Sequence, residues 1–266
     1  RYGEWLHVQL FEGKRPLSDA DVETHVNALA DAVRCPRARI VLKHRQRQRG
    51  SAQYERLAAD GESFTVSEYG LRFEVNLKRY LDTGLFLDHR ETRRLVRDQA
   101  RGRRVLNLFA YTGSFSVYAG AGGAERVVTV DLSKTYQDWT WRNLALNGLD
   151  DRTVQQLVCT DVLKYLHEAI AGRERYDLIV LDPPSFSNSK RMRATFDVQR
   201  DQVALLNAPR GTLYFSTNRQ GFRLAPELAE RGLFTELDRE TLAEDFRRRR
   251  GHRCWRVTRE VEGNPS

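Results

Sequence analysis

The chain has 266 residues, 40% of them hydrophobic, and a formal net charge of +8. This length supports one sizeable α/β domain with a smaller one, and the apolar content argues against disorder and against a membrane-spanning protein. Only six of the 44 basic residues are lysine, and arginine binds phosphates and base edges well, so nucleic acid is an expected partner.

Residues 1–85 are predicted to form a small α+β subdomain. Ser18 is the expected N-cap of a helix that runs to about Val33, and the strands are expected at Trp5–Phe11, Ile40–Lys43, Phe64–Ser67 and Leu71–Leu77, the last two as a hairpin. The basic run that contains Arg45, Arg47 and Arg49 fits either a solvated loop or an RNA backbone contact.

Residues 86–266 are predicted to form the main domain. A helix is expected at Arg90–Gln99, and strands then alternate with helices that begin near Ser114, Ser133, Asp161 and Arg193. The expected strands are Val105–Phe109, Val127–Val130, Val154–Cys159, Leu178–Leu181 and Thr212–Ser216. Such alternation predicts right-handed βαβ units and a doubly wound sheet. Two closing strands, Leu233–Leu237 and Cys254–Thr258, follow, and one of them is expected to be antiparallel.

Asp182 follows the apolar run Tyr176–Leu181, which is typical of a buried parallel strand. The acid is therefore expected at the carboxyl end of the strand, where open α/β sheets bind their ligands. Pro183 and Pro184 stiffen the segment, and Phe186 could stack against a flat ligand such as a base. Taken alone, the segment fits a strand-to-loop stop about equally well.

A cofactor site is expected where the first strand of this sheet ends, because a turn with Gly113 leads directly into a helix. No G-x-G-x-x-G is present, which argues against a dinucleotide. Asp131, at the end of the second strand, could bind ribose hydroxyls, and Asp161, after the third, could accept from an amine of adenine. Each acid alone fits a cap or loop charge, but together with Asp182 they indicate a nucleoside cofactor without a diphosphate, and S-adenosylmethionine fits.

The three cysteines, Cys35, Cys159 and Cys254, lack CxxC or paired-histidine spacing, so we expect neither a zinc site nor disulfides. We therefore expect no bound metal. The cysteine pattern also predicts a reducing, cytoplasmic compartment. The chain starts at Arg1 and its only methionine is Met192, which suggests a piece of a longer protein.

Several segments resemble the class I methyltransferases that modify large-subunit ribosomal RNA: Tyr80–Arg90, Asn107–Ser114, Asp131–Ser133 and Asn143–Gly148. The segments Asp182–Met192 and Phe196–Asp201 narrow the resemblance to guanine-N7 methyltransferase modules of 23S ribosomal RNA. In many bacteria such a module is the C-terminal half of a fused enzyme. The stretch Leu205–Thr212 is shorter than the crossover helix and glycine turn of that family.

The resemblance implies a Rossmann-like class I methyltransferase fold with a seven-stranded, doubly wound sheet, and an N-terminal subdomain that helps to bind RNA. It also implies that S-adenosylmethionine is bound by Phe86, Asp88, Arg90, Asn107, Phe109, Tyr111, Thr112, Gly113, Ser114, Asp131, Leu132, Ser133, Asp161 and Val162. Lys190 and Arg191 join the basic run as expected RNA contacts. The expected partners are 23S ribosomal RNA and a fused N-terminal half that binds RNA or methylates it.

For guanine N7 the expected catalytic segment is Asp182, Pro183, Pro184 and Phe186. The ring nitrogen carries an in-plane lone pair, so alignment and charge complementarity matter more than a strong base. A cytosine-C5 enzyme would need a cysteine nucleophile after the fifth strand, where this chain has Phe215–Asn218. Methylation of guanine N2 or adenine N6 is the open alternative among enzymes. A non-catalytic RNA-binding module is the alternative from another functional class.

Overall fold

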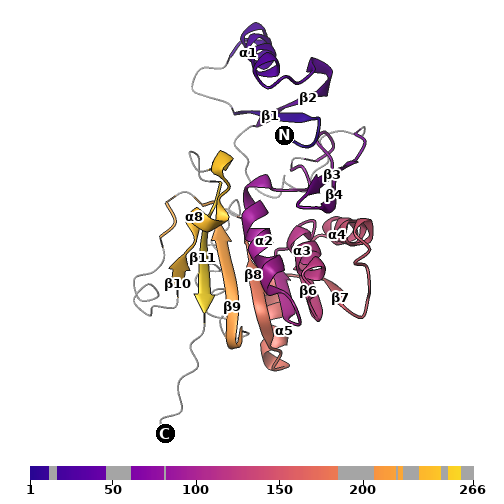
Figure 1. Cartoon of the computed structure of the whole chain (residues 1–266), viewed down its shortest axis with the longest axis vertical. Helices are drawn as coiled ribbons and strands as arrows, with labels where there is room; N and C mark the ends of the chain where they lie inside the picture. Colours follow the sequence, from indigo (N-terminus) through magenta and orange to yellow (C-terminus); the bar gives the residue numbers. More distant parts are fainter. Residues whose placement is uncertain are drawn as a thin grey trace. The chain divides into compact units, whose positions relative to one another are not determined.

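The computed structural model describes residues 1–11, 17–45, 61–80, 82–184, 207–219, 221–223, 234–246 and 251–258 (Figure 1). Two compact units are present, Arg1–Ser67 with Val75–Thr83, and Glu68–Glu74 with Gly84–Ser266. The helix expected near Arg193 lies outside the described residues. Within the described ranges no helix is both long and apolar enough to cross a membrane.

The first unit contains a helix beside two parallel strands. These elements are β1 (Leu6–Phe11), α1 (Asp19–Ala32), the 3₁₀ turn η1 (Arg37–Arg39) and β2 (Ile40–Arg45), with β1 pairing β2 in parallel. Ser18 caps α1 as predicted, in a capping box with Asp21. Val22, Val26, Ala30, Cys35 and Ile40 form the small core of this unit.

Strands β3 (Phe64–Glu68) and β4 (Leu71–Val75) form a two-stranded sheet, as predicted. The residues between them, Tyr69 and Gly70, both have positive φ angles, 48° and 82°. Positive φ at both central residues is the feature of a two-residue hairpin turn whose twist matches that of the strands.

The second unit is built on a seven-stranded sheet with the order β10-β11-β9-β8-β5-β6-β7. Its strands are β5 (Arg104–Leu108), β6 (Arg126–Asp131), β7 (Gln155–Cys159), β8 (Tyr176–Leu181), β9 (Asn207–Thr217), β10 (Phe234–Glu236) and β11 (Arg253–Thr258). β5 to β9 are parallel, whereas β11 is antiparallel to both of its neighbours. The predicted Rossmann-like fold is therefore confirmed.

Helices cover both faces of this sheet. The longer ones are α2 (Arg90–Gln99), α3 (Ser114–Ala121), α4 (Lys134–Leu146) and α5 (Val162–Ala171), and the short ones are η3 (Leu87–His89), α8 (Asp238–Thr241) and η4 (Glu244–Phe246). Alternate strand residues supply the two cores, because successive side chains point to opposite faces. Leu106 and Ile179 belong to a cluster with α5, and Val105 and Leu178 to a cluster with α2 and α3.

Strand β9 begins earlier than predicted. It starts at Asn207 instead of Thr212, and its register with β8 shifts between Tyr176 and Leu178. The sequence missed this start because Pro209 and Gly211 interrupt the apolar pattern from which the strand was inferred.

Candidate functional site

The predicted acids are gathered at one edge of the sheet. Strands β5, β6, β7 and β8 run parallel and are neighbours, so their carboxyl ends meet there. Asp131 ends β6, Asp161 comes two residues after β7, and Asp182 follows β8 directly. The structure thus brings together three side chains that are far apart in sequence.

The turn between β5 and α3 has an unusual backbone. Phe109 and Tyr111 have φ angles of 55° and 52°, and Gly113, the N-cap of α3, has φ of 72°. A side chain at Gly113 would also place its Cβ 2.2 Å from Thr140. Left-handed non-glycine residues cost free energy and collect at functional sites. The turn leads directly into the N-terminus of α3, where backbone N–H groups and the helix dipole favour an anion.

Two predicted cofactor residues hold this turn from within. Thr112 is fully buried and its hydroxyl donates to the carbonyl of Gly84 at 2.6 Å. The buried amide of Asn107 donates to Ser116 at 2.9 Å. Both side chains therefore support the turn, and a ligand can reach these positions through the backbone only.

Asp131 links the turn to β6. Its carboxylate accepts from the N–H of Tyr111 at 2.8 Å and from the N–H of Ser133 at 2.9 Å. Burial raises the pKa of this carboxyl above its usual range, although the backbone donors of Ser133 and Tyr111 oppose the shift. Each oxygen keeps a lone pair that a ribose hydroxyl can use.

Two other residues near the strand ends, Ser133 and Asp161, cap helices. Ser133 caps α4 by accepting from Tyr136, and Asp161 caps α5 by accepting from the N–H groups of Leu163 and Lys164. Asp161 is exposed at the same time, so its carboxylate stays open to a ligand.

The remaining members of the predicted set differ in exposure. Leu132 is 62% exposed, which is unusual for leucine and suits a partly apolar ligand. Val162, the first residue of α5, is buried in the core, and Phe109 in the turn packs against the same core. Ser114 opens α3 and is half-buried.

Aromatic rings border the turn on the side of η3. Phe86 is 44% exposed and its ring lies 5.2 Å from that of Tyr111. The hydroxyl of Tyr111 accepts from the N–H of Gly84 at 2.8 Å. Arg93 donates to the carbonyl of Phe86 at 2.9 Å and to both carboxylate oxygens of Glu68, so a buried ion pair fixes this wall.

Asp88 and Arg90 each have a protein partner. Asp88 lies 3.0 Å from Nδ1 of His252, and Gly251 passes so close that a Cβ there would lie 2.6 Å from its carboxylate. Burial raises the pKa of Asp88, but His89 and the hydrogen bond of His252 outweigh this and hold it well below its usual range. Arg90 makes a two-pronged ion pair with Asp245, at 2.6 and 3.1 Å.

Asp182 is held by two residues from other elements. The hydroxyl of Ser216, in β9, donates to Oδ1 at 2.6 Å, and Nε2 of His89 lies 3.5 Å from Oδ2. The Asp182 side chain is 29% exposed, so its carboxylate stays accessible. Burial lowers the pKa of His89, which favours the neutral imidazole at pH 7. Pro183 and Pro184 follow in a segment that is neither helix nor strand.

Asp88, His89 and His252 bring possible metal ligand atoms within 4.8 Å of one another. The two imidazole rings are stacked, with centroids 3.8 Å apart and an angle of 11° between planes. Their in-plane lone pairs therefore lie in nearly parallel, separate planes, an arrangement that disfavours a shared ion. The geometry instead favours a stacked histidine pair in which His252 contacts the Asp88 carboxylate and His89 contacts that of Asp182.

Some predicted residues lie outside the described part: Phe186, Arg47, Arg49, Lys190 and Arg191. Arg45 ends β2, and only its backbone is described. The sequence analysis also missed His89, His252 and Ser216. Ser216 was considered only as a position that lacks cysteine, and no local pattern connects His252 with a residue 164 positions earlier.

The site fits S-adenosylmethionine. The buried Asp131 carboxylate suits a ribose, the exposed Leu132 and Phe86 offer apolar surface to the adenine and the thioether, and the N-terminus of α3 suits a carboxylate. The single glycine of the turn does not provide the close approach that a diphosphate requires.

Asp131→Asn is expected to weaken cofactor binding by about 10- to 100-fold, since hydrogen bonds to a charged group contribute about 1.5–3 kcal/mol. Because the pKa of Asp131 is raised, the wild-type affinity should begin to fall at a higher pH on acidification than for an ordinary aspartate, and the variant should lack this fall. Calorimetric titration with S-adenosylmethionine across pH measures both effects.

Asp151→Asn is the matched control, because exposed Asp151 also accepts from a backbone N–H, that of Thr153, in another loop. It should bind the cofactor as the wild type does. Equal affinities of the Asp131→Asn variant and the wild type would rule out the assigned role of Asp131.

Comparison with known proteins gives a consistent result. Residues 6–249 match the family described as S-adenosylmethionine-dependent methyltransferase. The chain is 46% identical over 268 residues to "Ribosomal RNA large subunit methyltransferase K/L" of Pseudomonas paraeruginosa, covering 97% of this chain and 36% of that protein. It is 44% identical over 266 residues to "Ribosomal RNA large subunit methyltransferase K" of Neisseria meningitidis, covering 96% of this chain and 75% of that protein.

Solved structures show the same fold. The crystal structure of the methyltransferase SMU.776 complexed with SAH superposes with a TM-score of 0.75 at 24% identity, over 97% of this chain and 70% of that one. The chain spans only about a third of the length of the K/L relatives.

Proposed function

Because the chain belongs to the S-adenosylmethionine-dependent methyltransferase family, we propose that it methylates N7 of a guanosine in 23S ribosomal RNA. The observation that carries the proposal is Asp182-Pro183-Pro184 at the carboxyl end of β8, on the same sheet edge as the cofactor residue Asp131. The substrate class rests on the relatives at 44–47% identity, which are named for large-subunit ribosomal RNA.

The chain's own residues align the base and complement its charge. When bound, S-adenosylmethionine supplies an electrophilic methyl group on a sulfonium. Transfer of this methyl group to guanine N7 would need no proton removal, because the ring nitrogen offers an in-plane lone pair and the ring would keep the positive charge. Asp182 can accept from an N–H of guanine and stabilise the charge that develops on the ring. Ser216 and His89 fix the carboxylate, so little reorganisation is needed during the reaction.

Cytosine-C5 chemistry is disfavoured by the positions of the cysteines. Cys254 is fully buried in β11, and burial raises the pKa of its thiol. Cys159 ends β7, three strands from β8, which corresponds to about 14 Å at the usual strand spacing. Cys35 is 4% exposed and is buried in the small core beside α1. A thiol that attacks a base beside Asp182 is not available from these positions.

Methylation of an amino group, guanine N2 or adenine N6, is the second candidate. It is favoured by the segment Asp182-Pro183-Pro184-Ser185, which resembles the tetrapeptide that such enzymes use to accept hydrogens from an amine. The two candidates differ in the product and not in the cofactor.

The test is methyl transfer from labelled S-adenosylmethionine to large-subunit ribosomal RNA that lacks its own modifications. Mass spectrometry of the nucleosides should find N7-methylguanosine. If the product is N2-methylguanosine or N6-methyladenosine, the proposed target atom is wrong, whereas the assignment of the cofactor stands. Cofactor binding without transfer to any RNA would support a binding-only role.

We further propose that residues 1–85 help to bind the RNA, with Arg45, Arg47, Arg49, Lys190 and Arg191 at the phosphates. The net charge of +8 and the arginine-rich composition support this assignment. The proposed site of action is the cytoplasm. For relatives of the longer K/L type, the additional chain is the proposed partner that presents the RNA.

Replacing Arg45, Arg47 and Arg49 with alanine is expected to weaken RNA binding and reduce its salt dependence. Each lost phosphate contact reduces the magnitude of the negative slope of log K against log salt by about 0.7–0.9. The loss of three contacts should therefore make this slope shallower by about 2. Filter binding or fluorescence anisotropy across salt measures it. If the RNA affinity and the salt slope of the variant equal those of the wild type, the basic run is a solvated loop and does not contact RNA.

A further inference from the structure

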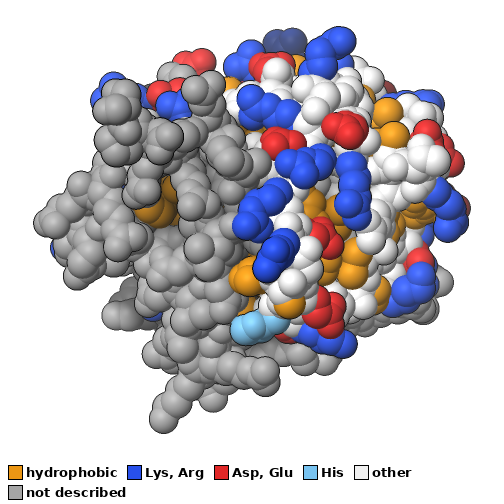
Figure 2. Space-filling view, turned by 90° about the horizontal axis from the view of Figure 1, so that it is seen from below, with side chains coloured by type: hydrophobic (Ala, Val, Ile, Leu, Met, Phe, Trp, Pro, Cys, Tyr) orange, Lys and Arg blue, Asp and Glu red, His pale blue; other side chains and the backbone are white. Residues whose placement is uncertain are grey.

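A row of arginines lies at the amino-terminal edge of the sheet, opposite the candidate site. Arg104 and Arg126 open β5 and β6 and are partners in the sheet register. Arg152 and Arg175 come shortly before β7 and β8, and the strand order β8-β5-β6-β7 makes the four starts neighbours. Figure 2, seen from below, shows Lys and Arg side chains gathered on the described part of this side. A row across four strands can contact successive phosphates.

Three of these four arginines have no direct ion pair among the described residues. Arg104 pairs with Asp177 at 3.1 Å, and both side chains are partly exposed. Within the described ranges, Arg126, Arg152 and Arg175 form no ion pair with a carboxylate, and all three are exposed. Exposed cations without acidic partners attract an anionic ligand.

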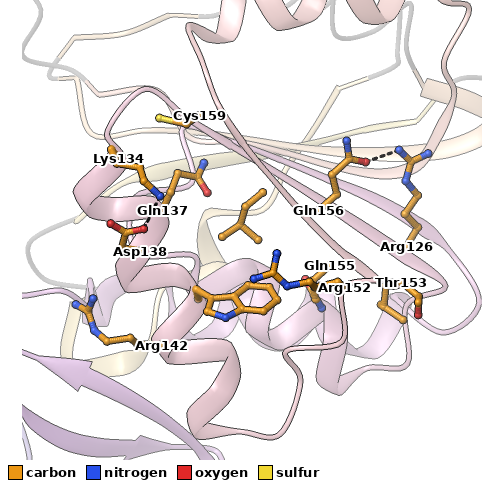
Figure 3. Close-up of a pocket in the computed structure, with 13 residues that line it drawn as sticks. Arg126, Lys134, Gln137, Asp138, Arg142, Arg152, Thr153, Gln155, Gln156 and Cys159 are labelled. Carbon is orange, nitrogen blue, oxygen red and sulfur yellow. Dashed lines mark hydrogen bonds and ion pairs between the residues drawn. The ribbon is translucent and has the colours of Figure 1, made fainter.

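One end of the row opens into a pocket of about 690 Å³ between α4 and β7 (Figure 3). We call it the α4–β7 pocket. Its apolar lining residues are Trp141, Val154 and Leu157, and Arg126 and Arg152 of the arginine row also line it. This volume is within the range of small-ligand sites and is large enough for a nucleotide.

The pocket carries groups that recognise bases. The guanidinium of Arg152 lies 4.8 Å from the centre of the Trp141 ring, and such a stacked pair offers a flat surface to a base. The wall contains Gln137 and Gln155, which are buried and whose side-chain oxygens have no hydrogen-bond partner among the described residues.

The pocket follows the edge strand of the sheet. Its lining runs from Arg126, at the amino edge, to Cys159, which ends β7 and is the register partner of Asp131. A chain bound along β7 would therefore run from the arginine row toward the cofactor edge. Four cations and one acid line the pocket, and they are Arg126, Lys134, Arg142, Arg152 and Asp138.

We infer that the α4–β7 pocket and the arginine row bind a single-stranded segment of the RNA substrate, with a base on the Trp141–Arg152 pair and phosphates along the row. This inference rests on the proposed function. It gives the chain an RNA surface that lies away from Asp182. Charge complementarity favours RNA over a protein strand added to the open edge of β7.

The first variant is Arg126→Ala/Arg152→Ala, and the control is Lys164→Ala/Arg239→Ala, which removes two exposed cations from α5 and α8. Affinity for a large-subunit ribosomal RNA fragment is measured across salt. The first variant should bind about ten-fold more weakly, and its slope should be lower by about 1.4–1.8. Its KM for RNA should rise, while kcat and cofactor affinity stay unchanged. The control should match the wild type.

Trp141→Ala should weaken RNA binding by about 5- to 100-fold with an unchanged salt slope, because a stacked base contributes about 1–3 kcal/mol and no charge is lost. Trp141→Phe should restore most of the affinity. These variants separate stacking from electrostatics.

If the arginine variant and Trp141→Ala bind RNA as the control does, while the wild type methylates RNA, the inference is wrong and the proposed function stands. The open edge of β7 would then be assigned to a protein strand. If the wild type transfers no methyl group to ribosomal RNA, the proposed function fails, and the binding data decide separately whether the pocket holds RNA.

Discussion

Asp182→Ala should lower kcat for methyl transfer by about 10²–10³-fold, the range for removing one preorganised polar group beside the reacting atoms. In the proposed mechanism Asp182 contacts the base and complements the charge that develops on it, whereas most of the proposed cofactor residues lie at or after the carboxyl ends of β5, β6 and β7. Cofactor affinity should change by less than about two-fold. Single-turnover transfer to ribosomal RNA and calorimetry with S-adenosylmethionine measure the two quantities.

The matched control is Asp177→Ala, on the same strand β8 but at its amino-terminal end, where it pairs with Arg104. It should keep the wild-type kcat. Ser216→Ala, which removes the 2.6 Å hydrogen bond to Asp182, should lower kcat by about ten-fold, because the carboxylate stays but is less well oriented. A normal kcat in Asp182→Ala would exclude the assigned catalytic role.

Arg93→Met should lower the free energy of unfolding by about 3–5 kcal/mol. Its side chain is 1% exposed and pairs with Glu68, which is 8% exposed, so the substitution leaves a buried carboxylate without its cation. Tyr118 also donates to Glu68 at 2.9 Å, and one hydrogen bond does not offset the lost charge. Denaturant unfolding followed by circular dichroism measures the change.

Arg94→Met provides the comparison for Arg93, because Arg94 is 54% exposed and its pair with Glu91 is at the surface. Its cost should stay below about 1 kcal/mol. The double variant Arg93→Met/Glu68→Leu should recover much of the stability, since apolar residues replace a buried pair well. If Arg93→Met and Arg94→Met lower the free energy of unfolding by the same amount, burial does not determine the contribution of the Arg93–Glu68 pair.

Local signals predicted the fold and the caps. Ser18, Ser133 and Asp161 were identified as helix starts because a cap depends on a few consecutive residues, and all three cap the helices in the structure. The alternation of strands and helices likewise implied that Asp131 and Asp182 share an edge of the sheet, since chain direction alone places them there.

Contacts between distant segments could not be predicted in this way. His252 lies against Asp88 and His89 only because β11 returns beside β9, and no pattern in the sequence signals that approach. The inward direction of Thr112 also depends on the left-handed turn, which the sequence shows only through Gly113. Side-chain direction within a site is set by tertiary packing.

The left-handed turn between β5 and α3 sets stability against activity. Phe109 and Tyr111 hold a conformation that costs about 1–3 kcal/mol per residue, and the carboxylate of Asp131 and the hydroxyl of Thr140 bind the Tyr111 backbone and maintain it. Glycine or asparagine at position 111 would relieve that strain. The same replacement would remove the ring that packs against Phe86, Tyr136 and Trp139 and the hydroxyl that accepts from the N–H of Gly84. The backbone strain is therefore the cost of keeping a tyrosine whose side chain supports the proposed cofactor site.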